Sequence, residues 1–147
     1  MTPRNFLIPG CAALLAALVG CSSPEPEAPA PAQPGETNVT LGGKDVGPTS
    51  DVSCATEGGR TIITIEGGQT TTVNLTDEKP PVVKSVSIGE AGSGGPSLLY
   101  AEGVSATPAS ATRDGNRYTV SGTGMGTDAA NPMVPVETPF EIVVTCP

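Results

Sequence analysis

The alternation of short apolar runs with turn residues, from Asn38 to the C-terminus, constrains the fold of this chain most strongly. Val, Ile, Leu and Thr alternate with polar residues, and Gly or Pro breaks the pattern about every eight to twelve residues. A period of two places alternate side chains on one face of a strand, so the pattern predicts strands. The side chains expected to face a core are Val52, Cys54, Ile63, Ile65, Val73, Leu75, Val86, Ile88, Leu98, Tyr100, Tyr118, Val120, Phe140, Ile142, Val144 and Cys146. We expect an all-β fold, a single small β-sandwich-like domain over residues 38–147.

Local signals refine this prediction at two places. Asp114-Gly115 stands between two alternating runs and predicts a two-residue hairpin turn in which both central residues can adopt positive φ. One or two helical turns could form near Asp128–Met133, although Pro132 and Pro135 limit them. We expect no other helix in this region.

The N-terminus has the pattern of an export signal. A short segment with one positive charge, Arg4, precedes the mostly apolar run Phe6–Val19, which is shorter than the roughly 20 residues that a membrane-spanning helix needs. Leu18-Val19-Gly20-Cys21 closes this run and has the form of a bacterial lipobox. We therefore predict a lipoprotein signal peptide over residues 1–20, cleavage between Gly20 and Cys21, and lipidation of Cys21. The alternative is an ordinary secretory signal that contains a cysteine by chance.

The four cysteines fit this interpretation. Cys11 lies inside the signal, and lipidation consumes Cys21. Cys54 and Cys146 remain as an even pair in an oxidising compartment, which predicts a disulfide between them. A metal site built on the two thiolates is the alternative, and the absence of histidine disfavours it.

Residues 21–37 form the predicted lipidated N-terminus and a linker rich in Pro, Ala and Glu. Its prolines, at positions 24, 26, 29, 31 and 34, disfavour helix and sheet and favour extended polyproline geometry. At about 3.1 Å per residue such a segment could reach roughly 50 Å. A spacer that lifts the domain off a membrane, a neutral connector and a proline-motif ligand all remain open, and we favour the spacer.

Composition and motifs exclude several function classes. The chain has 7 basic and 15 acidic residues, and loss of residues 1–20 removes only Arg4, which leaves a net charge of −9. Such a surface does not attract nucleic acid or anionic lipid headgroups electrostatically. The chain has no histidine to act as a general base near neutral pH. We expect no enzyme, no catalytic residue, no metal site and no cofactor.

The chain also contains carboxylate and glycine clusters, residue types that occur in metal-binding and phosphate-binding loops. Asp77-Glu78, and Asp45 with Asp51, lack the spacing of a calcium-binding loop, so we interpret them as exposed turn residues. The glycine runs Gly42-Gly43, Gly92–Gly95 and Gly122–Gly126 lack the strand-to-helix context of a phosphate-binding loop. We interpret these runs as turns and bulges.

Several segments resemble the mycobacterial nineteen-kilodalton lipoprotein antigen family. The resemblance is carried by the segments Pro80–Gly89 (PPVVKSVSIG), Ala111–Gly126 (ATRDGNRYTVSGTGMG), Ala130–Val136, Phe140–Cys146 (FEIVVTC) and Val52–Cys54. Their order and spacing cover about residues 39–147. One difference is that linkers in this family tend to be rich in threonine and O-glycosylated, whereas this linker offers few acceptor hydroxyls.

The resemblance implies a membrane-anchored envelope lipoprotein, exposed outside the cell and without catalysis. It further implies an antigen or adhesin whose acylated N-terminus is sensed by a host receptor pair built on Toll-like receptor two. The alternative is an extracytoplasmic carrier that binds a lipid or glycolipid in a cleft between sheets. For a carrier we expect the mouth at the loop Glu90–Pro96 and the segment Asp128–Pro139, because both are irregular and flank strands.

Overall fold

The computed structural model describes residues 36–147, and the structural statements below concern this part of the chain. All of its regular structure is β-strand, and none of these residues forms a helix that could cross a membrane. The all-β prediction is confirmed. The ten strands are β1 (Asn38–Leu41), β2 (Lys44–Asp45), β3 (Thr49–Glu57), β4 (Arg60–Gly67), β5 (Thr71–Thr76), β6 (Val83–Ile88), β7 (Ser97–Ala101), β8 (Ser110–Asp114), β9 (Arg117–Thr127) and β10 (Val136–Thr145).

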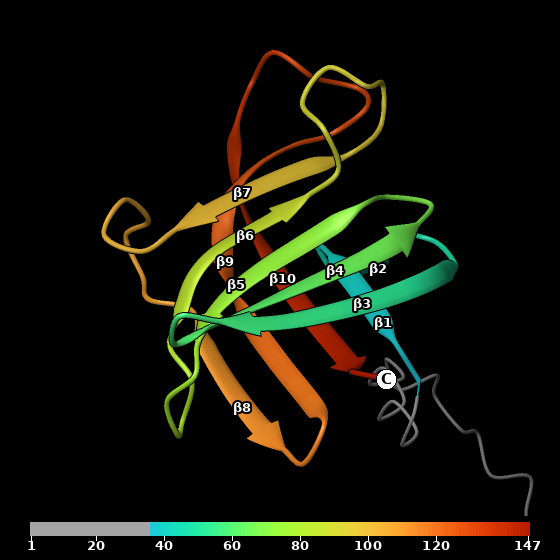
Figure 1. The fold of residues 1–147 in the computed structure, drawn as a ribbon. Helices are drawn as coiled ribbons and strands as arrows, with labels where there is room; N and C mark the ends of the chain where they lie inside the picture. The colour runs from blue at the N-terminus through green and yellow to red at the C-terminus, as the bar shows by residue number, and fades with distance from the viewer. Residues whose placement is uncertain (1–35) are drawn as a thin grey trace, which may run out of the picture. The chain divides into compact units, whose positions relative to one another are not determined.

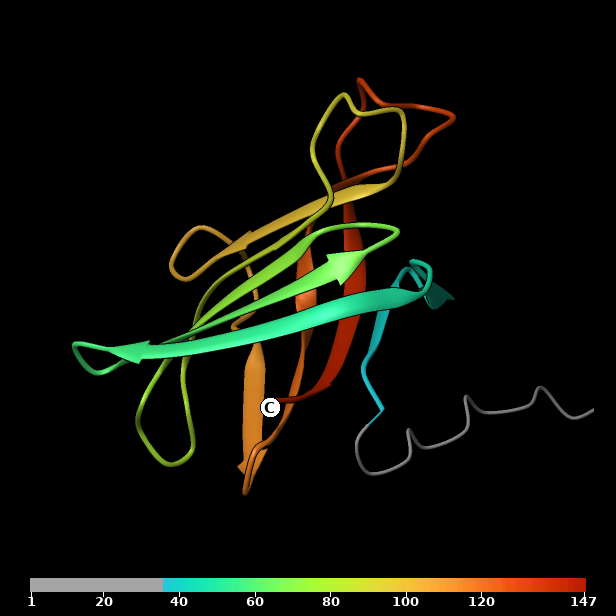
Figure 2. The ribbon, with the colours of Figure 1, turned by 45° about the vertical axis from the view of Figure 1, so that its right-hand side comes forward.

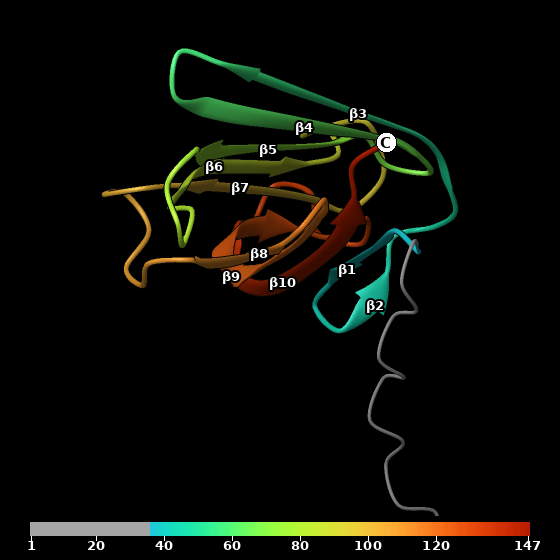
Figure 3. The same ribbon diagram turned by 60° about the horizontal axis from the view of Figure 1, so that its bottom comes forward.

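The strands form one antiparallel sheet that folds over on itself. Its main path runs β2-β1-β10-β9-β7-β6-β5-β4-β3, and β8 pairs with β9 beside that path. Strands β3 to β7 form one layer, and β1, β2, β8, β9 and β10 form the other (Figures 1 and 3). The apolar faces of both layers meet in one core, which gives the sandwich-like arrangement that the alternation predicts.

Aliphatic side chains that alternate along their strands fill this interior. Fully buried members come from β4, β5, β6, β9 and β10, and they are Ile63, Val73, Leu75, Val86, Ile88, Val120, Ile142 and Val144. Each such burial stabilises the fold by about 1.5–3 kcal/mol relative to exposure. Tyr100 of β7 and Phe140 of β10 contact each other between the layers, with ring centroids 6.0 Å apart. The predicted inward faces are confirmed, and Val52, Cys54 and Cys146 are partly buried against the core.

The glycine run at the end of β9 corrects the sequence interpretation. Gly122, Gly124 and Gly126 lie inside a paired strand, not in a turn or bulge, and their side-chain positions point to the inward face. A Cβ on Gly124 would lie 2.8 Å from the carbonyl oxygen of Leu99, and a Cβ on Gly122 would lie 2.7 Å from the Cβ of Ala109. These glycines are therefore required because β7 and the segment before β8 pass very close to β9.

The hairpin between β8 and β9 corrects a second prediction. Asp114 pairs with Arg117, so the two central residues of the turn are Gly115 and Asn116, not Asp114 and Gly115. Gly115 has φ of 58°, whereas no residue other than glycine has positive φ among those described. A single positive φ, at the first central residue, is typical of a type II′ turn. The segment Asp128–Met133 contains turns and bends but no helix.

Strand register defines two opposite ends of the domain. At one end, Asn38 pairs with Val143, and Arg117 pairs with Thr145 close to the β8–β9 turn. We call this the β1 end, because the chain enters the domain there. At the other end lie residues 89–96 and 128–135, and we call it the loop end. Figure 2 shows these two loops above the sheet and the β8–β9 hairpin below it.

Candidate functional site

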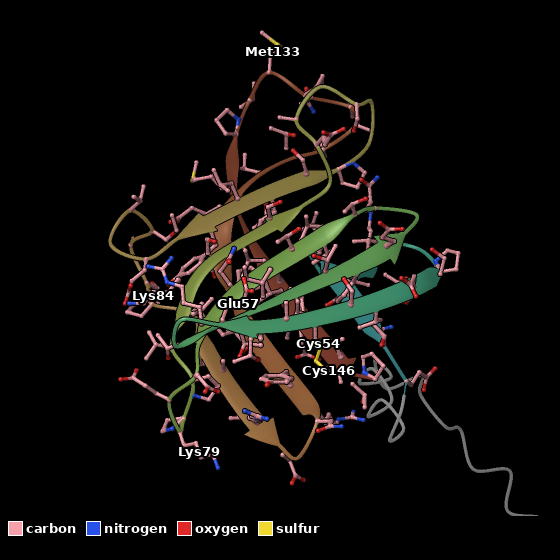
Figure 4. The ribbon with its side chains drawn as sticks, in the orientation of Figure 1. Cys54, Glu57, Lys79, Lys84, Met133 and Cys146 are labelled. Carbon is pink, nitrogen blue, oxygen red and sulfur yellow. A yellow bond between two sulfur atoms is a disulfide. The ribbon has the colours of Figure 1, made fainter. Side chains whose placement is uncertain are left out.

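Cys54 and Cys146 meet at the open side of the folded sheet. β3 is the last strand of the sheet path and pairs only with β4, whereas Cys146 directly follows β10 in the other layer. A disulfide joins Cys54 to Cys146, with their Cα atoms 5.9 Å apart (Figure 4). A hydrogen bond from the Thr49 hydroxyl to the carbonyl oxygen of Thr37, 3.3 Å long, spans the same opening. The covalent bond therefore links layers that no strand pairing joins at this side in the described residues.

The lipidation and cleavage predictions lie outside the described residues. Gly20, Cys21 and the linker as far as residue 35 are not part of what the structure describes. Lipidation of Cys21 and cleavage before it therefore stay predictions from the sequence.

The two segments expected to form a carrier's mouth lie at the loop end. Figure 4 shows Met133 at the tip of the second segment, where its side chain is 89% exposed. A small apolar concavity of about 230 Å³ lies on the outer face, lined mainly by Leu99, Val104 and Met125. Glu137 also lines it, whereas no residue of the loop Glu90–Pro96 does. The structure thus brings one of the two predicted segments, but not both, to this concavity.

Sequence reasoning missed the outward apolar residues of this concavity, although a signal was present. Leu98 faces the core, so the period of two places Leu99 on the outer surface, where it is 60% exposed. Leu99 pairs with Met125 across β7 and β9, and Met125 pairs with Glu137 across β9 and β10. Two large apolar side chains therefore stand side by side on the outer surface of the sheet.

The carboxylates weighed as catalytic or metal-binding groups have local structural partners. Asp45 accepts hydrogen bonds from the Asn38 amide and from the backbone N–H of Gly47, both 2.7 Å long. The Thr76 hydroxyl donates to Glu78 at 3.1 Å. Asp45 lies in β2 and Asp51 in β3 instead of in turns, which corrects that interpretation for both residues. In residues 36–147, no three Cys, Asp or Glu side chains gather as metal ligands would.

Comparisons with known proteins agree with the sequence motifs. Residues 30–146 match the model of a family described as the Mycobacterium 19 kDa lipoprotein antigen. The chain is 41% identical to Lipoprotein LpqH of Mycobacterium tuberculosis strain H37Rv, over 95% of this chain and 94% of that protein. It is 37% identical to Lipoprotein LpqH of Mycobacterium avium, over 97% and 96% of the two chains. It is 36% identical to a putative lipoprotein of Mycobacteroides abscessus, over 97% and 98%.

The chain matches these lipoproteins over nearly their whole length. A lipoprotein is held at a membrane of the cell envelope by its lipid. The resemblance stated from the sequence is therefore confirmed. The chain belongs to the mycobacterial 19 kDa lipoprotein antigen family.

Proposed function

We propose that this protein is an exported lipoprotein, anchored through acyl chains on Cys21, which displays its β-domain on the extracytoplasmic face of the membrane, exposed at the envelope surface. Its acylated N-terminus is the part that a host receptor built on Toll-like receptor two would sense, and the displayed domain would contact host cells as an adhesin. No catalytic step is part of this function. The observation that carries the proposal is Leu18-Val19-Gly20-Cys21 at the end of a short apolar run.

The physics of lipid anchoring supports this assignment. Each buried methylene contributes about 0.8 kcal/mol, so a single acyl chain binds a membrane only marginally, whereas two or three chains bind stably. A diacylglyceryl group on the thiol of Cys21, with an N-acyl group on its amine, would supply three chains. The same apolar chains, once extracted from the membrane, fit a hydrophobic receptor pocket.

The packed interior favours display over carriage of a lipid. The core positions are occupied by aliphatic side chains with no exposed surface, such as Ile63, Val86 and Ile142. The apolar concavity at Leu99 and Met125 measures about 230 Å³. Ligand pockets usually enclose about 300–1,000 Å³, so this concavity is small for a lipid. A lipid or glycolipid carrier remains the second candidate, and this concavity is where its ligand would bind.

The test of the anchor is Cys21→Ser in a mycolate-producing host, with Cys11→Ser as the matched control. We expect the Cys21→Ser protein in the culture medium and the Cys11→Ser protein in the membrane fraction, because only Cys21 would carry lipid. Retention of the Cys21→Ser protein in the membrane fraction would refute the anchor.

A second measurement separates display from carriage. The secreted Cys21→Ser protein, analysed by native mass spectrometry, should show its own mass alone if the domain is displayed without cargo. A reproducible extra mass in the lipid range would instead make the domain a carrier. Reporter cells that express Toll-like receptor two should respond to the acylated protein and not to the Cys21→Ser protein.

A further inference from the structure

A cleft at the β1 end, with a lining of mixed polar and apolar character, contains cations on a chain of acidic net charge. It lies between residues 77–82, which connect β5 to β6, and the hairpin of β8 and β9, and its volume is about 610 Å³. Its lining consists of Lys79, Pro80, Pro81, Thr112, Arg113, Gly115 and Asn116. Among these described residues there are two cations and no carboxylate, in a chain that carries net charge −9 after signal removal.

The cleft exists because strand pairing stops early on this side of β8. β8 pairs with β9 along one edge, but on its other edge a single bridge joins Ser110 to Val82. The preceding residues, Pro80 and Pro81, have no backbone N–H and so cannot continue the pairing toward Arg113. The chain and the strand therefore diverge, and the space between them is lined by side chains.

The guanidinium group of Arg113 has contacts that hold it in place and an N–H group, Nη2, that remains available. Its Nε donates to the carbonyl oxygen of Gly115 at 3.0 Å, and its Cζ lies 5.2 Å from the ring centroid of Tyr118. Its Nη1 lies 3.5 Å from a carboxylate oxygen of Asp77, a long contact between side chains that are 33% and 45% exposed. In the part of the chain that the structure describes, Nη2 makes no hydrogen bond. A fixed guanidinium with free N–H groups is suited to bind an anion through two parallel hydrogen bonds.

The other lining residues add a second charge and neutral groups. Lys79 lies on the loop between β5 and β6 (Figure 4), and no ion pair or hydrogen bond of its ammonium group occurs within residues 36–147. Thr112 and Asn116 offer a hydroxyl and an amide, and the two proline rings offer apolar faces. A bare phosphate ion would fill only a small part of about 610 Å³. Hydroxyl groups and C–H faces on the same ligand would use the remaining space.

We propose that this cleft binds a phosphate group esterified to a polyol. Arg113 and Lys79 contact the phosphoryl oxygens, which carry up to two negative charges and so match two cations better than a carboxylate does. Asn116 and Thr112 bind hydroxyl groups, and the prolines pack against the carbon chain. This site is separate from the lipid on Cys21, and its existence does not depend on the proposed display function.

The position of the cleft allows two sources for such an ester. The β8–β9 turn lies at the β1 end, where Asn38 pairs with Val143 and the chain enters the domain. A predicted spacer that can reach roughly 50 Å leaves both a membrane headgroup and a free ester within range. Because the net charge of the domain opposes an anionic surface, we expect the free ester to bind more readily than the headgroup.

The test is a titration of the secreted Cys21→Ser protein with sn-glycerol 3-phosphate, followed by amide chemical shifts. We expect saturable shifts at the amides of Lys79, Val82 and residues 112–116. Lys79→Gln should weaken binding by about ten- to a hundredfold, the effect of losing one charge-assisted hydrogen bond. Lys84→Gln is the matched control, because Lys84 pairs with Glu102 and does not line the cleft. Arg113→Lys keeps the charge but loses the planar fork, so it should also weaken binding while the protein stays folded.

Other probes separate the parts of the proposal. Equal affinity for inorganic phosphate would overturn the polyol part, and equal affinity for lactate would overturn the phosphate part. Co-sedimentation with phosphatidylglycerol vesicles, with phosphatidylcholine vesicles as the neutral control, distinguishes a headgroup from a free ester. The proposal fails if Lys79→Gln and Lys84→Gln bind alike, or if neither the soluble ester nor the vesicles bind in a way that depends on Lys79.

Discussion

Replacing Cys54 and Cys146 together by alanine is expected to lower the free energy of unfolding by about 4–5 kcal/mol. The two residues are 92 positions apart, so the disulfide closes most of the domain into one loop in the unfolded chain. In the chain-entropy model the stabilisation grows with the logarithm of that loop length. Domains of this size are stable by about 5–15 kcal/mol, so the variant should be close to unfolding at ordinary temperature.

The assay is urea unfolding of the secreted Cys21→Ser protein with and without the two cysteines, followed by circular dichroism. The slope of the free energy against urea should also rise, because the unfolded chain becomes less compact without the crosslink. The protein that keeps both cysteines should behave like the double variant once a phosphine has reduced its disulfide. Ser53→Ala, an exposed change in the same strand, should alter stability by less than about 0.5 kcal/mol. A loss below about 1 kcal/mol in both the double variant and the reduced protein would refute the loop-closure reasoning.

Hydrogen exchange gives this prediction a local form. β3 pairs with β4 on one side only, and beyond the chain connection from β2 the disulfide links it covalently to the other layer. Without that link, the amides of β3 should lose protection before those of β9 and β10, which lie between paired neighbours. Uniform loss of protection across all strands would show that β3 is not held separately.

Three further substitutions test the packing. Gly124→Ala should destabilise the domain by about 1–3 kcal/mol, because its Cβ would meet the backbone oxygen of Leu99 at 2.8 Å. Gly95→Ala is the control in the same urea assay. It should destabilise the domain less, because the atoms nearest to its Cβ belong to the flexible Gln69 side chain. Tyr100→Phe should cost about 1–3 kcal/mol, since the hydroxyl accepts a 2.9 Å hydrogen bond from the backbone N–H of Ala109; thermal melting checks this, and an unchanged midpoint would contradict it. Lys84→Ala should change stability by less than about 1 kcal/mol, because its ion pair with Glu102 is exposed; a larger loss by urea unfolding would show that this pair matters more than surface pairs usually do.

Much of the fold was predictable because its rules are local. The inward residues of each strand, such as Ile63 and Ile65 or Phe140 and Ile142, follow from a period of two and were identified without a structure. The Asp114-Gly115 pair predicts the hairpin turn one residue earlier than the structure has it. Asp-Gly is a favoured turn pair, but strand register decides which residues are central, and it places Gly115 and Asn116 there.

Features that depend on which strands become neighbours were not predictable from the sequence. Gly122, Gly124 and Gly126 look like turn residues in a linear sequence, and only the close passage of β7 and of the segment before β8 gives them their role inside a strand. The same reason explains why the cleft lined by Lys79 and Arg113 cannot be found from the sequence. Lys79 and Arg113 are far apart in sequence. They line one space only because Val82 bridges to Ser110 of β8 and the prolines before Val82 end the pairing. The predicted anchoring motif at Cys21 is a contiguous run of residues, so sequence alone suffices to propose it, whereas a binding site on the β-domain has to be found in the folded chain.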